Sequence, residues 1–202
     1  MKRRVTAAVW MAVLGLGFGE CARGVWIPAK AELAQLLLRR AWVRTCGGVD
    51  EARPWPWADT WPVARLRMPE HDTDLIVLAG ASGSTMAFAP GHLHGTAAPG
   101  ESGICVIAGH RDTHFDVLDD LEPGQRVELE LRSGARHRYL VTEAAVVHER
   151  DLAALDRGGP GSLVLLTCWS FDGVGSGGEL RYLVRAAPEE EIRSPASSCA
   201  TS

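Results

Sequence analysis

The sequence lacks the patterns that define disulfide scaffolds, zinc fingers and nucleic-acid-binding proteins. Its 202 residues contain no Cys-x-x-Cys pair and no His at zinc-finger spacing from paired cysteines. The formal net charge of −4 gives no reason to expect nucleic acid as a partner, and no segment repeats at a fixed period as in a solenoid. The cysteines are odd in number, so at least one thiol stays free within the monomer: Cys21, Cys46, Cys105, Cys168 and Cys199.

A long membrane-spanning run is also missing, because the apolar stretch near the N-terminus covers only residues 5–19. A full span needs about 20 residues. Lys2, Arg3 and Arg4 precede the stretch, and no small-x-small cleavage site follows it. We therefore expect an uncleaved signal-anchor at residues 1–24, with the N-terminus in the cytoplasm and the main domain on the outer or periplasmic side of the inner membrane. A cleaved signal peptide is the alternative, and it also places the main domain outside the cytoplasm.

Residues 25–60 predict an amphipathic helix followed by an extended connector. Between residues 29 and 44, apolar side chains recur at helical spacing and form one stripe. Such a helix could pack against a globular domain or lie along the bilayer surface. The dense prolines of Pro54-Trp55-Pro56-Trp57 exclude a helix or a central strand from the connector.

Residues 61–188 predict a domain of many short strands separated by turns rich in Gly and Pro, which is typical of an all-β barrel or sandwich. We expect one short helix at residues 148–157 and a loop at residues 89–102. Residues 189–202 are acidic and rich in Ser, carry no core pattern and are expected to be disordered. The strands are expected at residues 63–68, 75–80, 104–109, 126–131, 137–142, 162–168 and 180–184.

Cys168 ends the most apolar of these strands, a position that puts a thiol at the rim of a rigid scaffold. A buried, inert thiol is the alternative. A Cys nucleophile also needs a partner for proton transfer and a donor for the developing oxyanion. His110 occupies the equivalent rim position after the strand at residues 104–109, and Arg181 opens the last strand. Arg181 is preferred over Arg185, which shares its face, because Arg181 sits nearer the rim.

Taken together, three motifs resemble the sortase family. They are AGHRDTHF at residues 108–115, LLTCW at residues 165–169 and LRYLV at residues 180–184, in the order His, Cys, Arg. Sortases carry a Thr-Leu-x-Thr-Cys motif; here Val164 stands in place of the first Thr, whereas Thr167 is kept. The similarity runs from about residue 61 to 187, and it looks most like the sortases of Gram-negative bacteria.

This resemblance implies a closed β-barrel of about eight strands and a cysteine transpeptidase activity. Cys168 would attack the Thr carbonyl of a Leu-Pro-x-Thr-Gly-like sorting signal to form a thioacyl enzyme, His110 would move the protons, and Arg181 would hold the substrate and stabilise the oxyanion. Thr167, Trp169 and Asp112 would contribute to substrate binding. The implied partners are a secreted or surface protein with a C-terminal sorting signal, an amine acceptor of the cell wall or of a protein, and the membrane.

Two other function classes stay open from the sequence. A metal-dependent hydrolase could use His110, Asp112 and His114, which share one face of an extended segment. A membrane-tethered β-domain without catalytic activity would leave Cys168 simply buried. Two further families of Cys enzymes fit poorly, since the L,D-transpeptidase motif is missing and papain-like proteases place Cys before His. No dense acidic cluster requires Ca²⁺, so no metal or cofactor is predicted.

Overall fold

The computed structural model describes residues 32–157, 159–169 and 178–190. The chain divides into two compact units, residues 1–37 and residues 38–202, and the second contains the whole β-domain. The predicted signal-anchor at residues 1–24 and the last residues of the predicted tail, 191–202, lie outside the described residues. Within the described part of the chain, no helix is long and apolar enough to cross a membrane.

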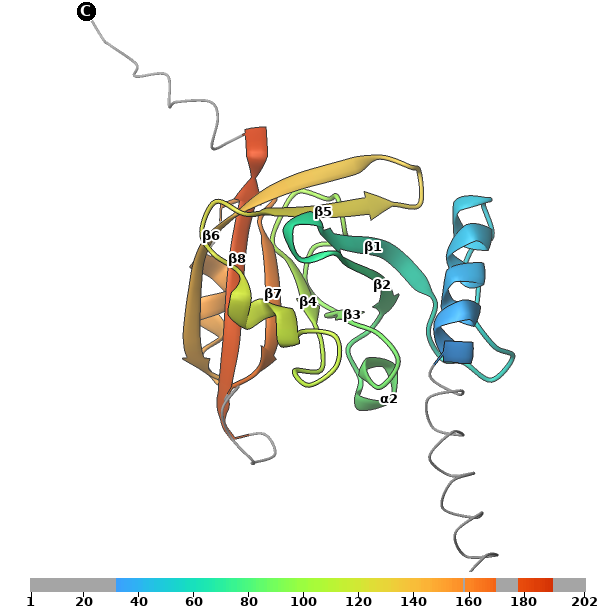
Figure 1. Ribbon diagram of the computed structural model, residues 1–202, viewed down its shortest axis with the longest axis horizontal. Helices are drawn as coiled ribbons and strands as arrows, with labels where there is room; N and C mark the ends of the chain where they lie inside the picture. Colours follow the sequence, from blue (N-terminus) through green and yellow to red (C-terminus); the bar gives the residue numbers. More distant parts are fainter. Residues whose placement is uncertain (1–31, 158, 170–177, 191–202) are drawn as a thin grey trace, which may run out of the picture. The chain divides into compact units, whose positions relative to one another are not determined.

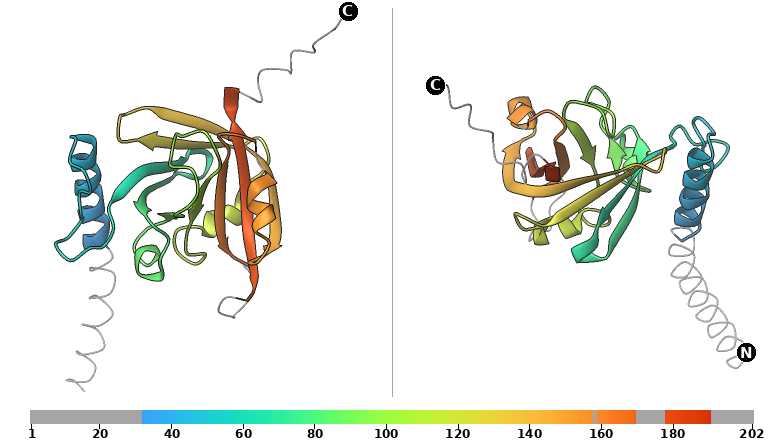
Figure 2. Two further views of the ribbon diagram at one scale, coloured as in Figure 1. Left: turned by 180° about the vertical axis from the view of Figure 1, so that it is seen from behind. Right: turned by 90° about the horizontal axis from the view of Figure 1, so that it is seen from above.

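Eight strands close into a barrel, as expected for the all-β fold class (Figures 1 and 2). Around the barrel the order is β1-β2-β3-β4-β7-β8-β6-β5, with β2–β3 and β4–β7 parallel and the other neighbours antiparallel. The strands are β1 (Pro62–Met68), β2 (Thr73–Ala79), β3 (Gly91–His92), β4 (Cys105–Ala108), β5 (Arg126–Leu131), β6 (Arg136–His148), β7 (Leu163–Cys168) and β8 (Leu180–Pro188).

Alternation of side chains fills the barrel interior. In β1 every second residue is buried, and the two arginines between them, Arg65 and Arg67, reach carboxylates on the neighbouring strands β2 and β5. Leu66 and Met68 are fully buried beside Leu129 from β5 in the same cluster. The interior is therefore a packed core rather than a channel.

A second apolar cluster covers the outer face of the sheet beside the strand that ends in Cys168. Val106 of β4, Val164 of β7 and Leu183 of β8 are buried there, with Leu155 of the 3₁₀ helix η3 (Leu152–Arg157) packed against them. β7 is thus covered on both faces, which explains why its sequence is apolar almost throughout instead of alternating.

The amphipathic helix is present and its described part covers residues 32–46. From residue 38 onward its apolar side packs against the barrel, because Leu38 and Trp42 are buried in one cluster with Ile76 and Leu78 of β2. The connector that follows forms turns and no regular element before β1, in agreement with its prolines.

Several boundaries differ from those expected. β6 runs to His148 and β8 to Pro188, because β6 beyond a bulge between Val141 and Glu143 continues to pair with β8. The helix expected at residues 148–157 is the shorter η3, and the loop expected at residues 89–102 contains β3. Three short helices were not expected: η1 (Pro69–His71), α2 (Gly83–Met86) and η2 (Asp116–Asp120). Glu189, the first residue of the predicted tail, is buried and forms an ion pair with Arg126 at 3.2 Å.

Candidate active site

Cys168 is the last residue of β7, and its side chain is half-buried. In the antiparallel pairing of β7 with β8, it lies directly opposite Arg181. Residues directly opposite one another project from the same face of a sheet, with Cβ atoms about 4.5–5.5 Å apart. The predicted nucleophile and the predicted oxyanion donor therefore begin from neighbouring positions on one face.

His110 reaches the same place from β4, which pairs in parallel with β7 on the side away from β8. Ala108 is the partner of Leu166, and the Gly109 N–H donates to the Leu166 carbonyl at 3.0 Å. His110 lies two residues beyond Ala108, just past the end of β4, and Cys168 lies two residues beyond Leu166, at the end of β7. Because β4 and β7 run parallel, both residues leave the paired strands at the same end of the sheet. The ends of β4 and β7 and the start of β8 thus bring the three predicted residues to one edge of the barrel.

The residues before His110 and Cys168 lock these two strand ends together. Thr167 is buried, and its hydroxyl donates a hydrogen bond to the Gly109 carbonyl at 2.8 Å. A Cβ on Gly109 would lie 2.7 Å from the ring of Phe115, which is itself fully buried. Gly109 and Thr167 therefore have a shared physical role: they hold the end of β4, which leads to His110, against the end of β7, which carries Cys168.

The guanidinium of Arg181 is held at the rim by three hydrogen bonds. Its Nη1 donates to the carbonyls of Gly178 at 2.6 Å and Leu180 at 2.9 Å, and its Nη2 donates to the Glu149 carboxylate at 2.6 Å. The alternative, Arg185, is opposite Val164, four residues before the end of β7, where it is buried and bonds Glu143. The rim position belongs to Arg181.

Residues 66–189 match the family model of the sortase domain, which is more than half of the chain. The chain belongs to the sortase family. It is 28% identical over 120 residues to Sortase D of Bacillus subtilis (strain 168), an alignment that covers 59% of this chain and 60% of that protein. The chain thus spans about three fifths of the length of this curated relative.

Solved sortases share the fold of this sortase. Sortase A from Corynebacterium diphtheriae superposes with a TM-score of 0.57 at 27% identity, covering 65% of this chain and 62% of that chain. Sortase C-1 from Actinomyces oris gives a TM-score of 0.55 at 31% identity, covering 63% and 72%. The closer likeness to Gram-negative sortases that the motifs suggest stays a prediction.

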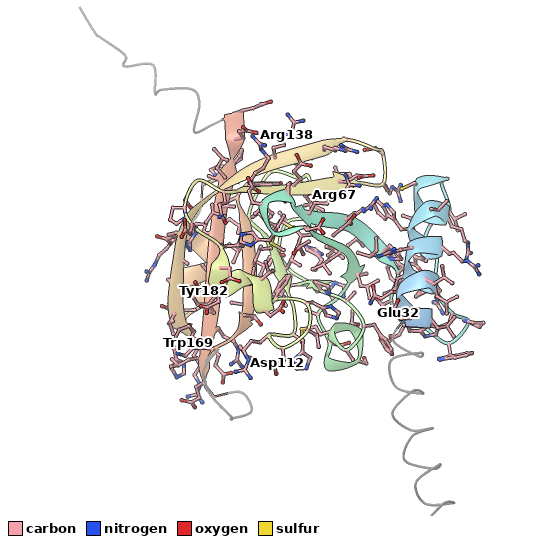
Figure 3. All side chains as sticks on the ribbon, viewed as in Figure 1. Glu32, Arg67, Asp112, Arg138, Trp169 and Tyr182 are labelled. Atoms are coloured by element: carbon pink, nitrogen blue, oxygen red, sulfur yellow. The ribbon has the colours of Figure 1, made fainter. Side chains whose placement is uncertain are left out.

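Two of the three residues predicted to bind substrate lie next to the predicted catalytic residues in the chain: Trp169 follows Cys168, and Asp112 comes two residues after His110. Trp169 and Asp112 both lie toward the lower end of the molecule in Figure 3, away from Arg138. Trp169 stacks on the Tyr182 ring, with centroids 5.5 Å apart and planes 19° from parallel. Asp112 lies on the exposed turn after His110 and is bonded to Arg111 at 2.6 Å, an interaction that holds the pKa of the Asp112 carboxyl below its usual value. The third, Thr167, uses its hydroxyl internally, on the Gly109 carbonyl.

Two charged residues at the site, Arg111 and Glu149, were not predicted from the sequence as functional residues. The pKa of the Arg111 guanidinium is raised chiefly by its hydrogen bond to Asp112 and in part by the charge of Cys168, so a second cation lies within electrostatic range of the thiol. Glu149 contacts Arg181 although 32 residues separate them in the chain. No sequence motif marks either residue. The turn after β4 brings Arg111 near the thiol, and the end of the β6–β8 pairing brings Glu149 to Arg181.

The geometry does not support the alternative metal site at His110, Asp112 and His114. Among the described residues, no three side chains of His, Cys, Asp or Glu are arranged to hold a metal ion. His114 turns into the protein instead, where burial lowers the pKa of its imidazole and its Nε2 finds no hydrogen-bond partner in the described part of the chain. Its backbone N–H bonds the His110 carbonyl at 3.1 Å and so helps to close the turn.

Proposed function

We propose that this sortase is a membrane-anchored cysteine transpeptidase that cleaves a Leu-Pro-x-Thr-Gly-like sorting signal and transfers the cleaved protein to an amine. The observation that supports this proposal is the meeting of β4, β7 and β8, which places Cys168 opposite Arg181 and brings His110 to the same end of the sheet. A thiol can act as the nucleophile, an imidazole can transfer the protons and a guanidinium can stabilise the oxyanion, so together they suffice for acyl transfer through a thioester.

In the first half-reaction the Cys168 sulfur, as thiolate, attacks the Thr carbonyl carbon of the sorting signal. The carbonyl oxygen takes up the negative charge, and Arg181 stabilises it with N–H donors. The tetrahedral intermediate collapses when the Thr–Gly C–N bond breaks and His110 delivers a proton to the departing amine. The products are a thioacyl enzyme on Cys168 and a released C-terminal fragment.

In the second half-reaction an acceptor amine attacks the thioester. His110, now neutral, removes the proton from the attacking nitrogen, and the C–S bond breaks to regenerate the Cys168 thiolate and the His110 imidazolium. Attack by water in place of the amine would give hydrolysis. The acceptor therefore determines the product: an amine gives a new amide bond, and water gives a free carboxylate.

The proposed location is the outer or periplasmic side of the bacterial inner membrane, with residues 1–24 as a single-pass anchor. The basic residues Lys2, Arg3 and Arg4 before an apolar stretch favour this orientation. Secreted proteins that carry sorting signals pass this surface, and cell-wall amines lie next to it, so the location fits the proposed partners.

The full-length chain, purified in detergent, tests the proposal with a library of fluorescent pentapeptide sorting signals, with and without added amines. We expect an amine-dependent ligation product and, by mass spectrometry, an acyl adduct on Cys168. Cys168→Ala and His110→Ala should each lower the transfer rate by at least about 1000-fold because each removes a member of the reacting unit.

Cys46→Ala is the matched control, since Cys46 is an exposed thiol on the N-terminal helix. It should transfer peptide at the wild-type rate, and circular dichroism should show the same fold for all three variants. Ligation that persists in Cys168→Ala would refute the proposed function.

A further inference from the structure

The guanidinium of Arg181 is fixed before any substrate arrives. A guanidinium has five N–H donors. The carbonyls of Gly178 and Leu180 take up the two hydrogens of Nη1, and the Glu149 carboxylate takes one hydrogen of Nη2. Among the described residues, no hydrogen bond is made by Nε or by the second hydrogen of Nη2.

The backbone of Glu149 is as firmly placed as its side chain. It follows the last two rungs of the β6–β8 pairing, in which Val147 lies opposite Arg181 and His148 opposite Leu180. The Glu149 N–H then donates to the Glu179 carbonyl at 2.7 Å, which extends the pairing by one more bond. The carboxylate therefore approaches Arg181 from a strand end that is tied to the same strand as Arg181.

We propose that Glu149 is a positioning residue that orients Arg181 for oxyanion stabilisation, an inference that rests on the proposed transpeptidase function. A long, flexible Arg side chain that is free in solvent must be ordered at the moment of reaction, and that ordering raises the barrier. Glu149 orders the Arg181 side chain in advance. Together with the carbonyls of Gly178 and Leu180, it fixes the orientation of the guanidinium, and with it the orientation of Nε and the second hydrogen of Nη2. The carboxylate acts through Arg181 and touches neither the substrate nor the thiol.

Glu179 is the matched control for this role. It is an exposed carboxylate on the same rim, two residues before Arg181, and it bonds His148 at 3.0 Å and Arg150 at 3.4 Å. Its carboxylate makes no bond to Arg181. Removing the Glu179 side chain removes one negative charge from the rim, as removing Glu149 does, but it leaves all three hydrogen bonds to Arg181 in place.

The test measures kcat and KM for peptide transfer by the full-length chain carrying Glu149→Ala, Glu149→Gln or Glu179→Ala. We expect Glu149→Ala to lower kcat by about 10- to 100-fold with little change in KM, because misplacing a catalytic group acts on the transition state. Glu149→Gln keeps an oxygen acceptor for Nη2 and should recover most of the loss. Glu179→Ala should retain the wild-type kcat.

A double variant shows whether Glu149 acts through Arg181. In an Arg181→Ala background, Glu149→Ala should cause no further loss, because two residues that share one interaction are not additive. A further loss as large as in the wild-type background would overturn the inference. So would a kcat for Glu149→Ala equal to that of Glu179→Ala. In both cases the proposed function stands, because the wild-type chain still transfers peptide and Cys168→Ala does not.

Folding of Glu149→Ala is checked by its melting temperature. Should that variant not fold, Glu149→Asp decides, because it keeps the charge and shortens the reach by one methylene. A reduced kcat for Glu149→Asp supports the positioning role, and an unchanged kcat contradicts it.

Discussion

Gly109 is the residue on which the position of His110 most directly depends. Its missing side chain leaves room for the Phe115 ring, which packs against the backbone just before the imidazole. Phe115 in turn donates its backbone N–H to the His110 carbonyl at 3.0 Å. One small residue thus allows the turn after β4 to fold back under His110.

We expect Gly109→Ala to destabilise the protein and to displace His110. The new methyl group would lie 2.7–2.9 Å from three carbons of the Phe115 ring, and a fully buried ring has no free space to move into. Overpacking of this kind costs about 1–3 kcal/mol. Thermal unfolding measures the loss of stability, and the peptide-transfer rate should fall in the protein that remains folded.

Gly83→Ala provides the control for Gly109→Ala. Gly83 begins the short helix α2, and a Cβ there would have no heavy atom within 4 Å. This variant should melt at or slightly above the wild-type temperature, because Ala favours helix over Gly. Equal melting temperatures for Gly109→Ala and the wild type would contradict the packing argument.

At the scale of elements, the site is a junction of two strand pairs, and the parallel pair β4–β7 is the less strongly connected one. Its ladder of paired residues ends at Ala108 and Leu166, before the reacting residues are reached. The hydrogen bond from the Thr167 hydroxyl to the Gly109 carbonyl carries the connection further toward the rim. This bond explains physically why a Thr precedes the nucleophile.

Thr167→Val should therefore reduce both stability and activity. The side chain keeps its shape, but the buried Gly109 carbonyl loses its hydroxyl donor, at a cost of about 1–3 kcal/mol. The two strand ends can then move apart, which lowers the transfer rate. Thermal unfolding and peptide-transfer kinetics measure the two effects.

Thr60→Val separates the two effects of Thr167→Val. The Thr60 hydroxyl is also buried and donates to the Ala79 carbonyl at 2.7 Å, at the end of β2, outside the β4–β7–β8 junction. We expect a similar loss of stability with transfer activity kept. If both Val variants retain full activity, the bond from Thr167 to Gly109 has no part in positioning the site.

Elements with strong apolar patterns were predictable from the sequence, and contacts made by polar side chains were not. β1 and β7 appear where alternation and a continuous apolar run placed them. His110, Cys168 and Arg181 were identified as a set because the order of their three motifs resembles that of sortases. The second half of β6 has no such pattern, since Glu143 and its nearest neighbours are exposed and this part of the strand is held chiefly by its pairing with β8. The contact between Glu149 and Arg181 depends on this second half of β6, which the sequence pattern does not reveal.

At the scale of the whole molecule, the barrel interior buries two groups that can ionise in alkaline solution. Cys105 and Tyr139 belong to the main core cluster, and their residues are 3% and 4% exposed. Burial raises the pKa of the Cys105 thiol from 9.0 to about 12 and that of the Tyr139 phenol from 10.0 to about 12. Both groups must stay neutral for the core to remain packed.

These two groups predict that the protein loses stability as the pH rises from about 9 to about 12. In that interval the unfolded chain releases their protons and the folded chain retains them, so the free energy of unfolding falls by about 1.4 kcal/mol per pH unit for each group that titrates. Below pH 9 the contribution of Cys105 is fully present. The sequence contains only two lysines, so few amines titrate over the same range.

Cys105→Ala tests which group causes the alkaline loss. The variant starts from a lower stability at pH 8, because it leaves a small cavity in the core, but its free energy of unfolding should fall less steeply between pH 9 and 11 than that of the wild type. Chemical denaturation at each pH measures the two slopes. Parallel slopes would mean that the Cys105 thiol ionises as easily inside the barrel as in the unfolded chain, and that water reaches this core residue, which pairs with Leu163 of β7.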